Sequence, residues 1–302
     1  MHDTVITPPP LNPGDRIALL SPAGIIKPQF VFDAVTVLQE QGWEPYVMPN
    51  ALGRSGTYSG TDDQRYSDLE AALLDPTTKA ILCNRGGYGV IHLLDRLDKL
   101  PLRDNAKWII GFSDISALHA LMHKHSIASI HSPMAKHLSL TRGVDDDSCA
   151  LFDILRGRKM TYDMPSHESN RTGSAEGIIT GGNLAVLAGL IGTPFDMLRP
   201  DTIWFLEDVS EPVYKVERIM YQLKLSGVLK NLRGLIVGKF TEYTPAIDSL
   251  TMEQMISSMV SEYDYPVAFD VPIGHVDHNL PMPESLPVKF TVSNESARIE
   301  YL

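Results

Sequence analysis

The chain has 302 residues, of which 43% are hydrophobic and 21% charged, and its 26 Lys and Arg residues against 37 Asp and Glu residues give a formal net charge of −11. This composition is typical of a globular protein and excludes a disordered, collagen-like or disulfide-scaffold chain. A nucleic-acid partner would require a basic face, and an anionic membrane surface would require a polybasic run. The sequence has neither, so we expect no nucleic-acid or membrane partner.

The first half of the chain alternates short apolar runs with amphipathic segments, which is typical of βα units that build a parallel sheet. Helices are predicted over Gln29–Gln41, from Thr61 to Leu74, and over Ile115–His125. The predicted strands are Arg16–Ser21, Glu44–Pro49, Lys79–Asn84, Lys107–Phe112 and Ser126–His131.

The composition changes between Gly157 and Ala175, where polar, Pro and Gly residues cluster without helical or strand periodicity. We therefore expect a first domain over residues 1–160, a linker over 161–174 and a second domain over 175–302. The second half predicts helices over Tyr214–Ser226 and Met252–Tyr263. Its predicted strands are Glu176–Thr180, Thr202–Leu206, Leu232–Phe240 and Pro266–Pro272, followed by a hairpin of Val288–Val292 with Arg298–Leu302.

The two cysteines, Cys83 and Cys149, lie far apart within or beside apolar runs, and neither belongs to a metal-ligand pair or a redox motif. We expect both to be buried free thiols in a reducing compartment. The N-terminal residues lack the basic and apolar segments of a secretory signal, and no run of about 18 apolar residues could span a bilayer. The sequence therefore predicts a cytoplasmic enzyme or binding protein.

Ser113 stands where an apolar strand breaks and passes directly into a helix. Such a turn exposes a hydroxyl at the carboxyl edge of a sheet, where a helix N-terminus and backbone N–H groups stabilise an oxyanion. The alternative is that Ser113 only caps the helix. The segment resembles a nucleophile elbow, but Ile115 stands where that motif has its second glycine.

A serine nucleophile requires a base, usually His, and an acid that orients it. Of the ten histidines, His275 follows a predicted strand, at a strand end where a side chain can project toward a cleft, with His278 as its local competitor. His131 at another strand end also remains open. The remaining candidates His119, His123 and His125 are expected on a solvated or packed helix face.

Glu207 follows the apolar strand 203–206, where an unpaired carboxylate would cost several kcal/mol. It is therefore either the orienting acid or a residue that caps a helix or pairs with Arg218. Asp208 and Glu211 are expected in a turn with more access to water. No group of His, Cys, Asp or Glu shows metal-ligand spacing, so no metal is expected.

Two glycine clusters complete the candidates: the RGGYG run that starts at Arg85, and Gly181-Gly182-Asn183 before a predicted helix. Both could hold a phosphate or an oxyanion, because backbone N–H groups at a helix start bind anions. Neither cluster matches a nucleotide-binding motif.

Taken together, several segments resemble the LD-carboxypeptidase family of serine peptidases, the muramoyltetrapeptide carboxypeptidases. The similarity runs in order through GDRIALLSPAG, NRGGYGV, IIGFSDISALH, GIITGGNLAVL, GTPFD, FLEDVSEPVYKVERIMYQL, GLIVGKF and PIGHVDHNLPMP. These segments cover nearly the whole chain, and their order and spacing are highly specific. One departure follows the histidine segment, where the family usually has Pro-Gly and this chain has Pro283-Glu284. We expect it to affect local loop shape or charge rather than the chemistry.

The resemblance implies that Ser113 is the nucleophile, Glu207 the acid and His275 the base of a catalytic triad. It also implies an oxyanion hole made by the backbone N–H groups of Gly86 and Asp114. The implied architecture is α/β, with a flavodoxin-like parallel-sheet N-terminal domain, a smaller β-rich α+β C-terminal domain and a cleft between them. A homodimer without a cofactor is also implied.

The implied reaction is hydrolysis of the bond between an L-diamino acid and the terminal D-alanine of murein tetrapeptides, in cytoplasmic cell-wall recycling. An exopeptidase must recognise the terminal carboxylate, for which Arg85, Gly182 and Asn183 are the candidates. A microcin-immunity-type peptidase that cleaves peptidyl or aminoacyl nucleotide conjugates ranks second, because the chain shows no obvious insertion for an extra loop. A non-catalytic peptide-binding protein is the alternative from another class.

Overall fold

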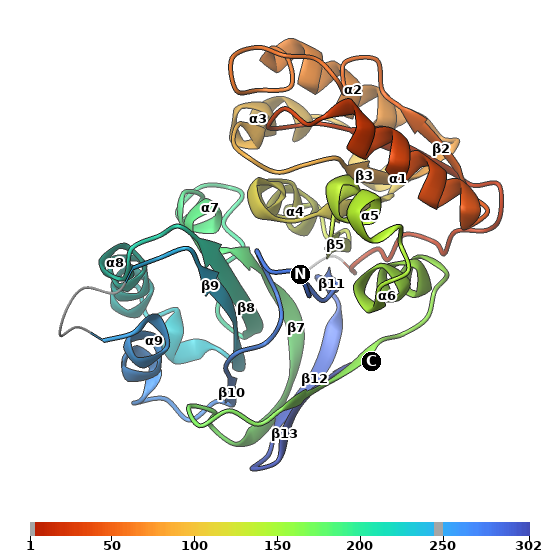
Figure 1. The fold of residues 1–302 in the computed structure, drawn as a ribbon. Coiled ribbons are helices and arrows are strands. Elements are labelled where there is room, and N and C mark those ends of the chain that lie inside the picture. Colours follow the sequence, from red (N-terminus) through yellow and green to blue (C-terminus); the bar gives the residue numbers. More distant parts are fainter. Residues whose placement is uncertain (1–3, 245–249) are drawn as a thin grey trace. The chain divides into compact units, whose positions relative to one another are not determined.

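The computed structural model describes residues 4–244 and 250–302, and the chain divides into two compact units. The first unit spans Met1–Arg158 together with Leu280–Ser285, and the second spans Lys159–Asn279 together with Leu286–Leu302. In Figure 1 residues 1–158 of the first unit run from red to lime and its segment 280–285 is blue, whereas the second unit runs from green to blue. The short segment 280–285 therefore brings the chain back into the first unit from far along the sequence.

The first unit is built on a six-stranded sheet in the order β11-β5-β4-β3-β1-β2. Strands β2, β1, β3, β4 and β5 are parallel, and β11 pairs antiparallel with β5. The parallel order 2-1-3-4-5 is that of flavodoxin-like folds. The strands are β1 (Arg16–Leu20), β2 (Glu44–Val47), β3 (Thr78–Cys83), β4 (Trp108–Gly111), β5 (Ser129–His131) and β11 (Met282–Glu284).

The helices that cover this sheet form two groups (Figure 1). In one group α1 packs against α5, and in the other α3 contacts both α2 and α4. A capping box in which Thr61 and Gln64 bond each other's backbone starts α2, at the position where the sequence predicts a helix to begin. The α-helices are α1 (Pro28–Glu40), α2 (Asp62–Leu74), α3 (Leu94–Leu97), α4 (Ser116–Lys124), α5 (Ala135–Thr141) and α6 (Asp146–Leu155). The 3-10 turns are η1 (Val90–Leu93), η2 (Leu102–Asn105) and η3 (Ser113–Ile115).

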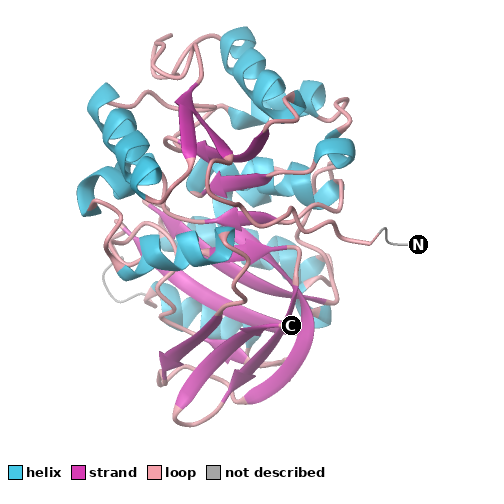
Figure 2. Cartoon of the chain, turned by 90° about the vertical axis from the view of Figure 1, so that its right-hand side faces the viewer, coloured by secondary structure: helices cyan, strands magenta, loops and turns pink. Residues whose placement is uncertain are grey.

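The second unit is built on a seven-stranded mixed sheet in the order β10-β9-β8-β7-β12-β13-β6. The first four of these strands are parallel, and β12, β13 and β6 continue the sheet antiparallel. Figure 2 shows these strands in magenta, the longest of them being β7. The strands are β6 (Thr161–Pro165), β7 (Gly173–Asn183), β8 (Thr202–Val209), β9 (Gly234–Thr241), β10 (Val267–Ala268), β12 (Pro287–Val292) and β13 (Ser296–Tyr301).

Helices α8 and α9 pack against each other in the second unit, and the apolar run 203–206 of β8 is fully buried in its core. The second unit contains α7 (Leu184–Ala188), α8 (Val213–Leu225), η4 (Leu229–Asn231) and α9 (Met252–Val260). Gly181 is required for close packing in this sheet, since a Cβ there would lie 1.9 Å from the Phe205 carbonyl oxygen.

The structure confirms the five parallel strands predicted for the first half and the predicted terminal hairpin. It corrects the expected linker over 161–174, because 161–165 form β6, which pairs with β13, and β7 begins at Gly173. It also corrects the expectation for Cys149, which is exposed, whereas Cys83 is buried. The polar alternation of β6, buried only at every second residue, hid this edge strand from the sequence analysis.

Candidate active site

Ser113 lies between β4 and α4 in a left-handed backbone conformation, with φ of 66°. A non-glycine residue in this region is strained, and the surrounding structure must hold it in place. Residues with such strained backbones are concentrated at functional sites. Neither η3 nor α4 has a side-chain cap, so the alternative that Ser113 caps a helix is wrong. The turn therefore presents the Ser113 side chain at the carboxyl end of β4.

The glycine loop after β3 lies directly against Ser113. A Cβ placed on Gly86 would lie 2.8 Å from the Ser113 Cβ and 2.9 Å from its Oγ, so only glycine fits. The loop is held in place because the Gly24 N–H donates to the Gly86 carbonyl at 3.0 Å. The structure thus brings Gly86 and Ser113 together, as the predicted oxyanion hole requires.

Arg65 anchors the same loop from α2, a role that the sequence analysis missed. Its buried guanidinium donates to the carbonyls of Pro22 at 2.6 Å and Gly89 at 2.9 Å, and it pairs with Asp62. Nothing in the local sequence distinguishes this arginine from an exposed helix residue, because its partners lie in two distant loops.

Asp114 and His119 fix the backbone on either side of Ser113. The buried Asp114 carboxylate accepts from the Val90 N–H at 2.9 Å, and burial raises the pKa of this carboxyl. His119 Nε2 donates to the Gly111 carbonyl at 2.8 Å, and its Nδ1 lies 2.9 Å from Ser129 Oγ. Burial lowers the pKa of His119 to about 4, so this imidazole is neutral at pH 7.

Glu284, the departure from the family pattern, lies in β11 beside this histidine. It pairs in register with Ser129, is fully buried, and places its Oε1 3.9 Å from His119 Nε2. The substitution therefore falls within a strand of the first unit rather than in a solvent-exposed loop.

Glu207 and His275 form a hydrogen-bonded pair in the second unit. His275 Nδ1 lies 2.8 Å from Glu207 Oε2, and the Glu207 side chain is fully buried whereas that of His275 is 23% exposed. Because a carboxylate only accepts, Nδ1 carries the proton, and in the neutral imidazole the lone pair is on Nε2. Among the described residues Arg218 has no ion pair with Glu207 and lies instead over the Tyr214 ring.

Burial of His275 lowers its pKa, but the hydrogen bond and charge of Glu207 outweigh burial, so the net pKa is raised above 6.5. The charges of Asp208 and Glu242 act in the same direction. Gly274 makes room for the pair: it has a φ of +118°, and a Cβ there would lie 2.7 Å from Glu207 Oε2. The Gly274 N–H is held by Asn279 Oδ1 at 2.8 Å.

Asp208 corrects one expectation, because it is part of β8 and only 2% exposed rather than in an open turn. Burial raises its pKa to about 6. Its carboxylate accepts from Asn183 Nδ2 and from the Ala185 N–H, each at 2.9 Å. Asn183 also caps α7 by accepting from the Val186 N–H at 3.1 Å. The Asn183 side chain therefore makes both of these bonds to groups of the second unit. Gly182, which precedes it, has a φ of +126°.

The other candidate histidines lie elsewhere in the fold and make different contacts. His131 is buried in β5 beside the Phe112 ring, His123 Nδ1 bonds Ser285 Oγ at 2.9 Å, and His125 pairs with Asp98. His278 is exposed. Arg85 is also exposed, and its Nη1 donates to the Ile25 carbonyl at 2.8 Å.

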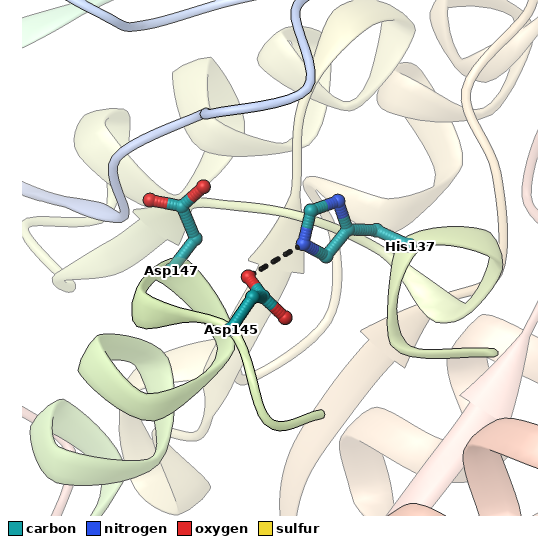
Figure 3. A group of neighbouring side chains, drawn as sticks. All are labelled: His137, Asp145 and Asp147. Carbon is teal, nitrogen blue, oxygen red and sulfur yellow. Dashed lines mark hydrogen bonds and ion pairs between the residues drawn. The ribbon is translucent and has the colours of Figure 1, made fainter. Parts of the chain in front are cut away.

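The fold brings together one group of side chains of metal-ligand type. Figure 3 shows His137, Asp145 and Asp147, which place ligand atoms within 4.8 Å of one another. Asp145 is already engaged, because it accepts from His137 Nε2 at 2.9 Å and from the hydroxyl and N–H of Ser148. These bonds assign Asp145 to capping α6.

Comparison with known proteins places the chain in a known class of hydrolase. Residues 17–132 match the family model of the LD-carboxypeptidase N-terminal domain, and residues 176–290 match that of the C-terminal domain. The chain therefore belongs to the LD-carboxypeptidase family and is a peptidase. In the part of the chain that the structure describes, no helix is both long and apolar enough to span a membrane.

Individual relatives agree with the family assignment. The murein tetrapeptide carboxypeptidase of Pseudomonas aeruginosa is 31% identical over 89% of this chain and 90% of its own. The crystal structure of muramoyltetrapeptide carboxypeptidase from Oxalobacter formigenes superposes with a TM-score of 0.83 at 26% identity, covering 95% of this chain and 98% of its own. The microcin C7 self-immunity protein of Escherichia coli is 26% identical over 97% of this chain and 96% of its own.

Proposed function

We propose that the protein is a serine LD-carboxypeptidase that releases the terminal D-alanine of murein tetrapeptides by hydrolysing its bond to an L-diamino acid. The observation that carries the proposal is the His275–Glu207 hydrogen bond, because a buried carboxylate on Nδ1 is the arrangement that makes Nε2 a general base. The name of the Pseudomonas relative supports the choice of substrate.

In the proposed mechanism, Ser113 Oγ attacks the carbonyl carbon of the scissile bond and its proton passes to His275 Nε2. The backbone N–H groups of Gly86 and Asp114 stabilise the oxyanion that forms. The carbonyl then re-forms, the C–N bond breaks, and His275 returns the proton to the departing amine. A water molecule, activated by the same histidine, hydrolyses the acyl-enzyme and regenerates the Ser113 hydroxyl.

The geometry of each unit supports one part of this mechanism. The strained backbone of Ser113 and its contact with Gly86 fit a nucleophile that is exposed beside an oxyanion hole. In the second unit, Glu207 holds the proton on Nδ1 and stabilises the imidazolium that forms during attack. A homodimer and a place in cell-wall recycling are also part of the proposal.

The test is release of the terminal residue from three tetrapeptides that differ only at the C-terminus: D-alanine, D-alanine amide and L-alanine. We expect the D-alanine peptide to have a kcat/KM at least about tenfold above the other two, equivalent to roughly 1.4 kcal/mol of transition-state binding. Equal cleavage of the three peptides would contradict a D-specific carboxypeptidase.

The second candidate is cleavage of an aminoacyl nucleotide conjugate, favoured by the similarity to the microcin C7 self-immunity protein over 97% of this chain. The same enzyme preparation, assayed with an aminoacyl sulfamoyl adenosine, separates the two functions. A kcat/KM for the conjugate above that for the tetrapeptide would replace the first proposal by the second.

A further inference from the structure

A pocket of about 650 Å³ lies within the first unit, on the side of the glycine loop where Arg85 stands. This volume is in the range of sites that hold small molecules or parts of peptides. Its walls come from the segment that leads into α1, from the loop after β3 and from α5. The lining residues used below are Ile25, Ile26, Lys27, Phe30, Arg85 and Lys136.

The pocket is basic, although the protein as a whole has a net charge of −11. Lys27, Arg85 and Lys136 line it together, and no acidic residue does. Within the described residues none of the three has an ion-pair partner, and the one bond of the Arg85 guanidinium goes to the Ile25 carbonyl. Basic groups gathered without counter-charges create a local positive potential that attracts anions.

The rest of the wall is apolar, formed by the half-buried side chains of Ile25, Ile26 and Phe30. A ligand that fits this wall combines a negative charge with aliphatic surface. A planar carboxylate suits the arginine in particular, since guanidinium N–H groups bind it in pairs. The chemistry is that of a carboxylate carried by a peptide.

The pocket and the candidate nucleophile are connected by the glycine loop, which contributes a residue to each. Arg85 directly precedes Gly86, which contacts Ser113, and the Gly86 carbonyl accepts from Gly24, which directly precedes Ile25. One wall of the pocket and one wall of the nucleophile site are therefore formed by the same loop.

We propose that this pocket is a carboxylate-recognition subsite for the peptide substrate, in which Lys27 and Lys136 supply the attracting charge and Arg85 the oriented hydrogen bonds. This inference rests on the proposed peptidase function. The carboxylate comes either from the substrate's C-terminus or from an internal acidic residue, and the two sources predict different results.

The test measures binding of peptides to the full-length Ser113→Ala protein by calorimetry, with and without the double substitution Lys27→Gln/Lys136→Gln. Three tetrapeptides are used: one with both an internal and a terminal carboxylate, one with the terminal carboxylate amidated, and one with the internal carboxylate amidated. Lys99→Gln is the matched control, because Lys99 is exposed in the same unit but outside the pocket.

We expect the double substitution to raise the Kd of the doubly acidic peptide at least tenfold and Lys99→Gln to leave it unchanged. The amidated peptide that no longer responds to the double substitution identifies which carboxylate the pocket holds. With Ser113 intact, the double substitution should raise KM rather than lower kcat. Since both lysines are exposed, thermal unfolding should be nearly unchanged.

An equal response of all three peptides, an equal effect of Lys99→Gln, or no measurable binding of any peptide would overturn the inference. Failure of the proposed function gives a different result. In that case the protein with Ser113 intact releases no terminal residue, yet the acidic peptide still binds in a way that depends on Lys27 and Lys136.

Discussion

Replacing Gly86 with alanine tests the contact between the glycine loop and Ser113. The added Cβ would lie 2.8 Å from the Ser113 Cβ and 2.9 Å from its Oγ, whereas ordinary contacts begin near 3.4 Å, so the serine must move by roughly half an ångström or more. A misplacement of about 1 Å at a reacting group lowers the rate by about 100-fold, and local overpacking destabilises a protein by about 1–3 kcal/mol. We therefore expect kcat/KM to fall by about 10- to 100-fold in a protein that still folds.

The assay is tetrapeptide hydrolysis, paired with urea unfolding of each variant. Gly189→Ala is the matched control, since its φ of −65° suits alanine and its nearest neighbour would be 3.3 Å away. Activity of Gly86→Ala within twofold of the unsubstituted protein would refute the claim that the glycine loop and Ser113 share one site.

Three further outcomes are expected. Glu207→Gln should lower kcat by about 100-fold or more with the fold intact, whereas Glu211→Gln should be mild; equal effects in the hydrolysis assay would remove Glu207 from its role. Since the base must be neutral and the net pKa of His275 is raised, kcat/KM should increase as pH rises through a value above 6.5. Glu207→Gln should shift this acidic limb of the pH-rate profile to lower pH. A profile without an acidic limb contradicts His275 as the base. Burial depresses the pKa of His119 from 6.5 to about 4, so between these pH values the unfolded chain binds a proton that the folded protein does not. The free energy of unfolding of the original protein, measured with urea, should therefore fall by up to about 3 kcal/mol as the pH falls from 6.5 to about 4. The same pH dependence in His119→Gln would contradict this.

Much of the first unit could be predicted from local sequence, because each parallel strand is a short apolar run bounded by polar turns and α1, α2 and α4 have their own periodicity. Helices α3, α5 and α6 were not predicted. The same reasoning located Ser113 at a strand end and His275 after a strand. Periodicity could not show that 282–284 return to pair with 129–131, since strand pairing across about 150 residues leaves no local signal.

The geometry around the site depended on tertiary contacts that no local pattern encodes. Arg65 binds carbonyls 43 and 24 residues away, and Asp208 continues the buried strand β8 where the sequence suggested a turn. The His275–Glu207 pair spans 68 residues. Sequence reasoning offered both members as candidates, but the hydrogen bond that distinguishes Glu207 from its acidic neighbours required the fold.

The central claim is that Ser113 is the nucleophile of a peptidase that removes one C-terminal residue. Mass spectrometry of a tetrapeptide incubated with the protein and with Ser113→Ala tests it most directly. We expect the original protein to convert the tetrapeptide into the tripeptide and free D-alanine. We expect Ser113→Ala, with an unchanged unfolding curve, to form these products at least about 1,000-fold more slowly. Cleavage at another bond, or product formation by Ser113→Ala within tenfold of the original rate, would contradict it.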